Sequence, residues 1–163
     1  MNLIVFVRVI SSVCTGLAAG IFVGHGMGVS LAVPHLSASS FVQLQQIIHT
    51  NFVPMMPILL AGAVGASIFW AVLLRSHWRR LEFWCVLVAA ILMVATLALT
   101  RVVNVPINEQ LMTWSVQAPP PNLTELWRPW QDAHSIRTVL AIVAFFVSAL
   151  ASSAFAPSGR QPK

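Results

Sequence analysis

Polar residues gather in one stretch of an otherwise oily chain, residues 101–137, where their spacing suggests a pocket with chemical function. On a helix, Arg101, Asn104 and Asn108 lie at i, i+3 and i+7 and therefore share one face. A second set, at i, i+3, i+7 and i+10, shares a face in the same way: Trp127, Trp130, His134 and Arg137. Because each set adjoins a long apolar segment, we expect two helix ends and a bridging loop whose polar faces meet in one pocket.

These residue types suit proton abstraction without a cofactor. A histidine can take a proton from a weakly acidic substrate near neutral pH, and N–H donors stabilise the resulting oxyanion best in a site of low dielectric constant. His134 is the expected base. The expected oxyanion-binding residues are Arg101, Asn104, Asn108 and Arg137, and the expected substrate-binding residues are Trp127, Trp130 and Gln45. In the alternative interpretation, the arginines reach to the membrane interface and the asparagines cap helix ends.

Haem is another use of the same residues, because haem needs an axial imidazole, an apolar slot and cations for its propionates. The candidate iron ligands are His25, His49 and His134, and the candidate propionate-binding residues are Arg101 and Arg137. No CxxCH motif is present, so the expected form is haem b, bound without a covalent link. A mononuclear metal site with two histidines and one carboxylate is the third option. Its ligands would come from His49, His134, Glu109 and Asp132.

Several other functions are excluded by residues that the chain lacks. It has no GxSxG, P-loop or HExxH motif, and its four acidic residues are too few for a ferritin-like di-iron site. Cys14 and Cys85 lie in apolar runs without CxxC spacing, so we interpret them as packing residues. The net charge of +5 comes from scattered residues, and this argues against nucleic-acid binding.

Composition indicates an integral membrane protein. Of 163 residues, 58% are hydrophobic and 8% are charged, whereas a soluble domain carries about 25% charged residues. A spanning helix needs about 20 apolar residues, so the chain has room for four spans in one domain. The expected spans are residues 3–33, 52–74, 81–103 and 135–155, with an extramembrane pocket segment at 104–134. In one alternative the helix of the third span continues to Trp114. The predicted fold is an all-α, four-helix membrane bundle with a short interfacial helix, residues 37–50, between spans 1 and 2.

Charge distribution predicts the orientation. The short turn at residues 75–80, RSHWRR, is the most basic in the chain, so the positive-inside rule makes it cytoplasmic. Arg160 and Lys163 near the C-terminus agree. Four spans then place both termini in the cytoplasm and the pocket at the outer face of the cell membrane. Since the chain has no tyrosine, its six tryptophans are expected to form the interfacial belt.

Small residues recur along the first span, at every fourth position: Gly16, Gly20, Gly24 and Gly28. Such a stripe lets another helix approach closely. That helix belongs either to the same bundle or to a second copy of the chain. His25 lies within the stripe, and an ionisable group at that depth is a candidate functional residue, with a structural histidine as the alternative.

Two motifs resemble those of a known family. The pattern N-x-P-I-N at residues 104–108 and the pattern W-x-x-W-x-x-x-H-x-x-R at 127–137, at the junctions of a four-span protein, resemble the anthrone oxygenase-like family. Members of that family are small membrane proteins, some linked to oxidation of anthrones to anthraquinones by O₂. The resemblance implies that the matching motif positions are Asn104, Asn108, His134 and Arg137. It leaves the substrate open, since most members have no known reaction.

We therefore expect a membrane-embedded oxygenase that acts on a small lipophilic molecule, anthrone-like or phenolic. The alternative is a non-catalytic membrane protein that binds haem or a small lipophile, or that docks a partner helix in a larger complex. The expected partners are the lipid bilayer, a lipophilic substrate and, through the glycine stripe, a second copy of the chain.

Overall fold

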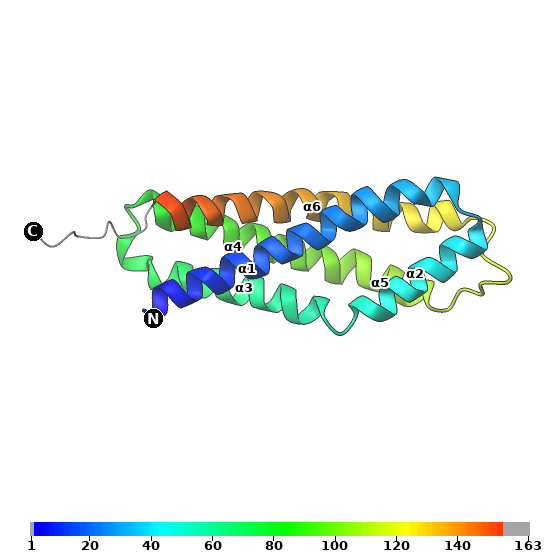
Figure 1. The fold of residues 1–163 in the computed structure, drawn as a ribbon, viewed down its shortest axis with the longest axis horizontal. Helices are drawn as coiled ribbons and strands as arrows, with labels where there is room; N and C mark the ends of the chain where they lie inside the picture. The colour runs from blue at the N-terminus through cyan, green and yellow to red at the C-terminus, as the bar shows by residue number, and fades with distance from the viewer. Residues whose placement is uncertain (1, 155–163) are drawn as a thin grey trace, which may run out of the picture.

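The computed structural model describes residues 2–154, which form a long bundle of helices (Figure 1). In chain order the elements are α1 (Leu3–Gly24), η1 (His25–Ser30), η2 (Val33–His35), α2 (Ala38–Phe52), α3 (Met56–Leu73), η3 (Arg75–His77), α4 (Leu81–Leu99), η4 (Thr100–Asn104), α5 (Val105–Leu111) and α6 (Leu123–Ala154). Four helical stretches are long and apolar enough to cross a membrane: Leu3–His35, Met56–Leu73, Leu81–Leu111 and Leu123–Ser153. The protein is an all-α membrane protein, and the predicted fold class is confirmed.

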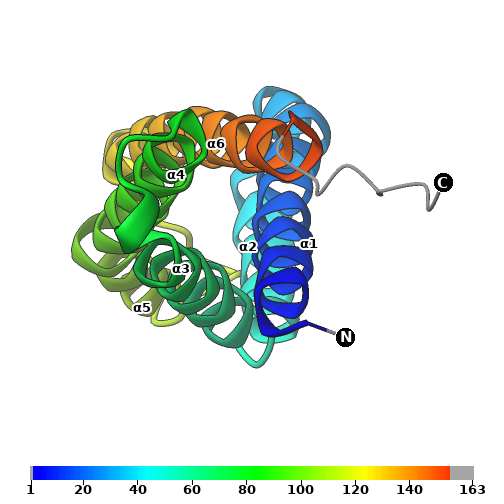
Figure 2. The same cartoon turned by 90° about the vertical axis from the view of Figure 1, so that its left-hand side faces the viewer.

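The four long helices surround a common axis (Figure 2). α1 packs against α3 and α6, and α4 packs against the same two helices from the opposite side. The start of α1 and the turn between α3 and α4 lie at one end of the bundle, which we call the turn end (Figure 1). α2, α5 and the connection at residues 112–122 lie at the other end, which we call the α2 end. The predicted short helix between the first two spans is α2.

Small side chains allow the helices to approach closely in the middle of the bundle. The buried core there includes Ala18, Ala63, Ala89, Ala141 and Ala144. Close approach matters in a bilayer, where dispersion contacts rather than exclusion of water hold helices together. A Cβ added at Gly16 would lie 2.9 Å from Cε2 of Phe145, so this glycine makes room for α6. At Gly20, Gly24 and Gly28 an added Cβ would meet nothing within 4 Å, and their pairing with a second copy stays a prediction.

The helices around the polar stretch extend beyond the predicted spans. The third stretch continues past residue 103 to Leu111, as the alternative with a helix to Trp114 predicted in outline. α6 begins at Leu123 instead of near Ser135. Polar side chains lower the hydropathy of these turns, but they pack against other helices and do not interrupt the backbone. The predicted end of span 4 at Phe155, and the basic Arg160 and Lys163, lie outside the described residues.

The predicted tryptophan belt is wrong for four of the six residues. Trp78 and Trp84 are exposed, whereas the others have relative exposures of 8% or less: Trp70, Trp114, Trp127 and Trp130. At the α2 end, three of these join Phe41, Val42 and Leu111 in one buried cluster. Their rings are buried because α2 folds back over α5 and the start of α6.

Two helical stretches widen into π-helical turns, η1 and η4, at the α2 end. In η4 the backbone N–H of Val105 bonds to the carbonyl of Thr100, five residues back. Pro106 follows directly, and its ring has no N–H and crowds the carbonyl of the preceding turn, which favours a wider turn there. In η1 the bulge follows Gly24 and contains Gly26 and Gly28. Such bulges are rare and are frequent at functional sites.

Candidate functional site

A cavity of about 550 Å³ lies at the α2 end, lined by side chains from all four spans and α2. Most of the predicted site residues line it: His25, Gln45, His49, Arg101, Asn108, Trp130, His134 and Arg137. Two do not: Asn104 is fully buried behind the wall, and Trp127 lines a neighbouring groove. The predicted polar faces of the third and fourth spans therefore do converge, and the first span and α2 add two histidines and a glutamine.

His134 is tied to its neighbours through both ring nitrogens. Arg137 donates to Nδ1 from Nη2 at 3.0 Å and from Nε at 3.3 Å. Nδ1 must then carry the lone pair, so Nε2 is the protonated nitrogen and donates to the carbonyl oxygen of Phe22 at 3.1 Å. In this arrangement His134 has no free lone pair, and its evident effect is to hold the guanidinium of Arg137.

Arg137 is a buried cation, with 7% of its surface exposed. Its Nη1 donates to Thr100 Oγ1 at 3.1 Å, and its guanidinium carbon lies 4.5 Å from the ring centroid of Phe22. No carboxylate among residues 2–154 forms an ion pair with it. Burial of a cation without a counter-charge is costly, so an anion in the cavity would be strongly favoured.

Two further nitrogens at the cavity lack partners. His25 Nε2 and Gln45 Nε2 are both buried, and neither has a hydrogen-bond partner in the part of the chain that the structure describes. The His25 ring lies 4.7 Å from the His134 ring and 5.1 Å from Trp130, centroid to centroid, and its Nδ1 is 3.5 Å from Ser30 Oγ. Buried polar groups are nearly always satisfied, so these two indicate a ligand site. Within residues 2–154, His25 rather than His134 has an imidazole nitrogen without a hydrogen bond, and the side chain of Gln45 lies beside it.

The rings along α6 form a stack. Trp127 and Trp130 lie 4.4 Å apart, and Trp130 and His134 lie 4.9 Å apart, with interplanar angles of 18° and 13°. Two asparagines hold the middle ring. Trp130 Nε1 donates to Asn108 Oδ1 at 2.7 Å, and Asn104 Nδ2 donates to the Trp130 carbonyl at 3.1 Å. Trp130 therefore forms a rigid flat wall, against which an aromatic molecule could stack.

A more polar group of side chains lies across the cavity, on α2, η4 and α5. His49 is half-buried there, while Arg101 and Glu109 are exposed. Burial lowers the pKa of His49, and the negative charge of Glu109 opposes part of this effect. The imidazole is therefore neutral at pH 7.

The two-histidine, one-carboxylate metal site is not assembled. No three His, Cys, Asp or Glu side chains come together as a metal site within residues 2–154. Asp132 is exposed and does not line the cavity. His49 and His134 do line it, but His134 has both nitrogens engaged.

Comparison with known families gives a match to Anthrone oxygenase over residues 44–147. The chain belongs to the anthrone oxygenase family. The match begins in α2 and ends in α6, so it includes both motifs that carried the resemblance, at residues 104–108 and 127–137. Most of the cavity wall lies inside the matched region, whereas His25 lies outside it. Searches of curated proteins and of solved structures found no match.

Sequence reasoning missed Thr100, which receives a hydrogen bond from Arg137 at 3.1 Å and donates one to its own helix at Thr96. A signal was present, because Thr100, Asn104 and Asn108 repeat every fourth residue. The carbonyl of Phe22, which fixes the His134 tautomer, carries no sequence signal.

Proposed function

We propose that this protein is a membrane-embedded oxygenase that uses O₂ to oxidise a small lipophilic anthrone-like or phenolic compound, bound in the cavity as its oxyanion. The observation that supports this most is Arg137, a buried cation without an ion-pair partner among residues 2–154, at the wall of a largely apolar cavity. Membership of the anthrone oxygenase family supports the same reaction class.

Arg137 would bind the oxyanion. A guanidinium has five N–H donors. Three of them are used by His134 and Thr100, which leaves two for a ligand. Asn108 adds an amide, because its oxygen accepts from Trp130 while its nitrogen remains able to donate. In a largely apolar site these donors stabilise a developing negative charge more than they would in bulk solvent.

His25 would be the base, since its Nε2 is buried without a partner in residues 2–154. It would remove a proton from the CH₂ group conjugated with the substrate carbonyl, and the C–H electron pair would move to the carbonyl oxygen. His134, whose nitrogens are both engaged, would act as a positioning residue for Arg137.

The overall reaction balances with one O₂. The enolate carbon forms a bond to O₂, and His25 returns its proton to give a hydroperoxide. Removal of the second C–H proton then breaks the O–O bond, which leaves a new carbonyl and releases hydroxide that takes up the proton as water. The CH₂ carbon is oxidised by four electrons, and O₂ supplies one oxygen atom to the product and one to water.

The test separates proton removal from oxidation. Purified protein is mixed with anthrone without O₂ while the absorbance of the enolate is followed, and O₂ uptake is then measured after admission of air. His25→Gln is expected to slow enolate formation about 10²-fold or more. Absence of anthrone-dependent O₂ uptake in the wild-type protein, or uptake unchanged by His25→Gln, would overturn the proposal.

The same cavity supports a second proposal, a haem-binding role. Iron needs an imidazole with a free nitrogen, which His25 offers, and the propionates need cations such as Arg101 and Arg137, which line the same cavity. An absorbance spectrum of the protein purified from cells supplied with haem separates the two. A Soret band that is lost in His25→Gln favours haem, and a spectrum without one favours the cofactor-free oxygenase.

A further inference from the structure

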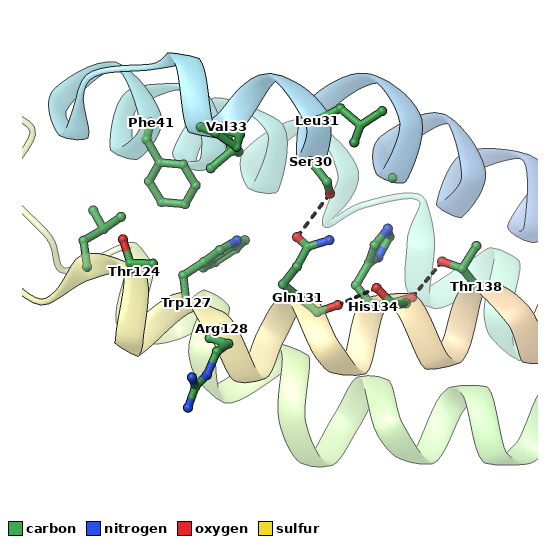
Figure 3. A pocket seen from close by; sticks show the side chains of 14 residues that line it. Ser30, Leu31, Val33, Phe41, Thr124, Trp127, Arg128, Gln131, His134 and Thr138 are labelled. Atoms are coloured by element: carbon green, nitrogen blue, oxygen red, sulfur yellow. Dashed lines mark hydrogen bonds between the residues drawn. The ribbon is translucent and has the colours of Figure 1, made fainter.

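A second pocket of about 590 Å³ lies between the end of the first span and the start of α6 (Figure 3). We call it the α1–α6 groove. Apolar side chains such as Leu31, Val33 and Phe41 line one side, and Trp127, Gln131 and His134 line the other. His134 is the one residue that lines both this groove and the cavity. The groove is therefore a separate space, on the far side of the α6 stack.

Trp127 contributes an unsatisfied donor to the groove. The residue is 5% exposed, and its Nε1 has no hydrogen-bond partner among residues 2–154. Its ring is held by the stack with Trp130 at 4.4 Å and by the edge of Phe41 at 5.3 Å. In Figure 3 the indole nitrogen is directed toward the space between Val33 and Gln131. A fixed, buried N–H that faces an apolar pocket indicates an acceptor on a bound molecule.

The neighbouring polar groups add one N–H donor and several hydroxyl oxygens, all of them uncharged. Gln131 Oε1 accepts from Ser30 Oγ at 3.1 Å, so its amide nitrogen is the part left for a ligand. Ser135 and Thr138 donate their hydroxyl hydrogens to carbonyls of their own helix. Arg128 lines the rim, but its guanidinium points away from the groove (Figure 3). The groove thus offers neutral N–H donors and hydroxyl oxygens, and its lining has no carboxylate.

We propose that the α1–α6 groove is a binding site for a neutral lipophilic ketone or quinone, whose carbonyl oxygen accepts from Trp127 Nε1. An anion or a cation would lack a charge partner inside the groove, because Arg128 points away from it and its lining has no carboxylate. The ester carbonyl of a membrane lipid has the same acceptor chemistry, but it is attached to a headgroup that stays in interfacial water. Because the Trp127 N–H is buried, its partner must leave that water, as a ketone without a headgroup can. This site does not depend on the reaction proposed for the cavity.

Benzophenone tests the proposal, because it is a neutral lipophilic ketone that forms covalent bonds to nearby C–H groups under ultraviolet light. The full-length protein in nanodiscs is labelled at increasing probe concentration, and the labelled residues are located by mass spectrometry of peptides. Saturable labelling is expected at residues 30–34 and 123–131. Trp127→Phe, which keeps a ring but removes the N–H, should raise the half-saturating concentration about two- to tenfold.

Three control variants and a change of lipid test whether labelling depends on the Trp127 N–H and on the groove itself. Trp70→Phe removes another buried indole N–H, at the turn end, that has no partner among residues 2–154, and it should change nothing. Val33→Trp should fill the groove and abolish labelling even if Trp127→Phe does not fold. Arg137 lines the cavity and not the groove. If Arg137→Gln abolished labelling while Trp127→Phe left it unchanged, the proposal would be overturned. Labelling that appears in ether-linked but not in ester-linked lipid would assign the groove to lipid esters and would also overturn it.

Discussion

The two ends of the bundle bury different kinds of polar group. Toward the turn end these include small hydroxyl groups, as in the pair Ser11–Ser67 at 2.9 Å, which joins α1 to α3, and the bond from Thr15 to the Ser11 carbonyl at 2.7 Å. Toward the α2 end, an imidazole and a guanidinium form bonds between helices, as His134 does to Phe22 and Arg137 does to Thr100.

The two ends also differ in what remains unsatisfied. Within residues 2–154, the buried polar atoms without partners at the α2 end belong to His25, Gln45, Asn104 and Trp127, whereas the turn end has Trp70. The π-helical turns η1 and η4 lie at the same end as the first group. Unsatisfied groups and widened helices lower stability, so their concentration at one end indicates a site supported by a well-packed scaffold. The predictions below contrast matched residues from the two ends.

Arginine replacement should give the largest contrast. Arg137→Gln removes the buried cation and is expected to reduce the rate of anthrone-dependent O₂ uptake about 10²–10³-fold, as the loss of an oxyanion-binding donor does in other enzymes. Arg8→Gln, at the turn end, removes only a bond from Arg8 Nη1 to the Ser152 carbonyl at 3.0 Å and should leave that rate unchanged. Equal losses in both variants would contradict the division into site and scaffold.

Replacement of a buried core alanine by a larger residue should lower stability without lowering the rate of O₂ uptake. Ala63 is fully buried in the central core, so Ala63→Leu should lower the free energy of unfolding by about 1–3 kcal/mol. Thermal unfolding in detergent measures this, and O₂ uptake per folded molecule should persist. Ala61→Leu, on the exposed face of the same helix, is the control and should cost little. A large loss at Ala61 would show that its face is covered by a partner.

Removal of an indole N–H should distinguish a satisfied group from an unsatisfied one. Trp130→Phe deletes the 2.7 Å bond to Asn108 and leaves that oxygen without its donor. Trp70→Phe deletes an N–H that has no partner in the described residues. Since both variants lose similar ring area, the first should be less stable than the second by about 1 kcal/mol in denaturant titrations. Equal stabilities would mean that the bond to Asn108 contributes nothing.

Acidification should give the smallest effect, through His49. Its folded-state pKa is lowered by burial, so below an unfolded pKa of about 6.5 the unfolded chain binds more protons than the folded one. This residue therefore makes the free energy of unfolding fall as the pH drops from about 6.5 toward the folded-state pKa. His49→Asn should flatten part of that fall, and His77→Asn, in the exposed turn, is the control. A steeper pH dependence in His49→Asn would refute the assignment.

Much of the architecture could be predicted from the sequence. The four apolar stretches, the short helix after the first span and the shared face of Trp130, His134 and Arg137 all follow from hydropathy and helical periodicity, which are local properties. The family resemblance rested on motifs of the same local kind. The predicted start of the fourth span lies too late in the chain, because the polar side chains in the first turns of α6 lower the hydropathy there as a loop would.

Tertiary structure alone decided which imidazole has a ring nitrogen without a hydrogen-bond partner among residues 2–154. His25 and His134 look equivalent as residue types, yet the Phe22 carbonyl, from another helix, engages one nitrogen of His134, and Arg137 engages the other. The same distinction separates Trp127, which has no hydrogen-bond partner for its indole in residues 2–154, from Trp130, which has Asn108. Residue type determines which hydrogen-bond donors and acceptors a side chain has, and periodicity determines the helix face on which it lies. Whether those donors and acceptors already have partners depends on residues distant in the chain, which only the packing of helices brings within hydrogen-bond distance.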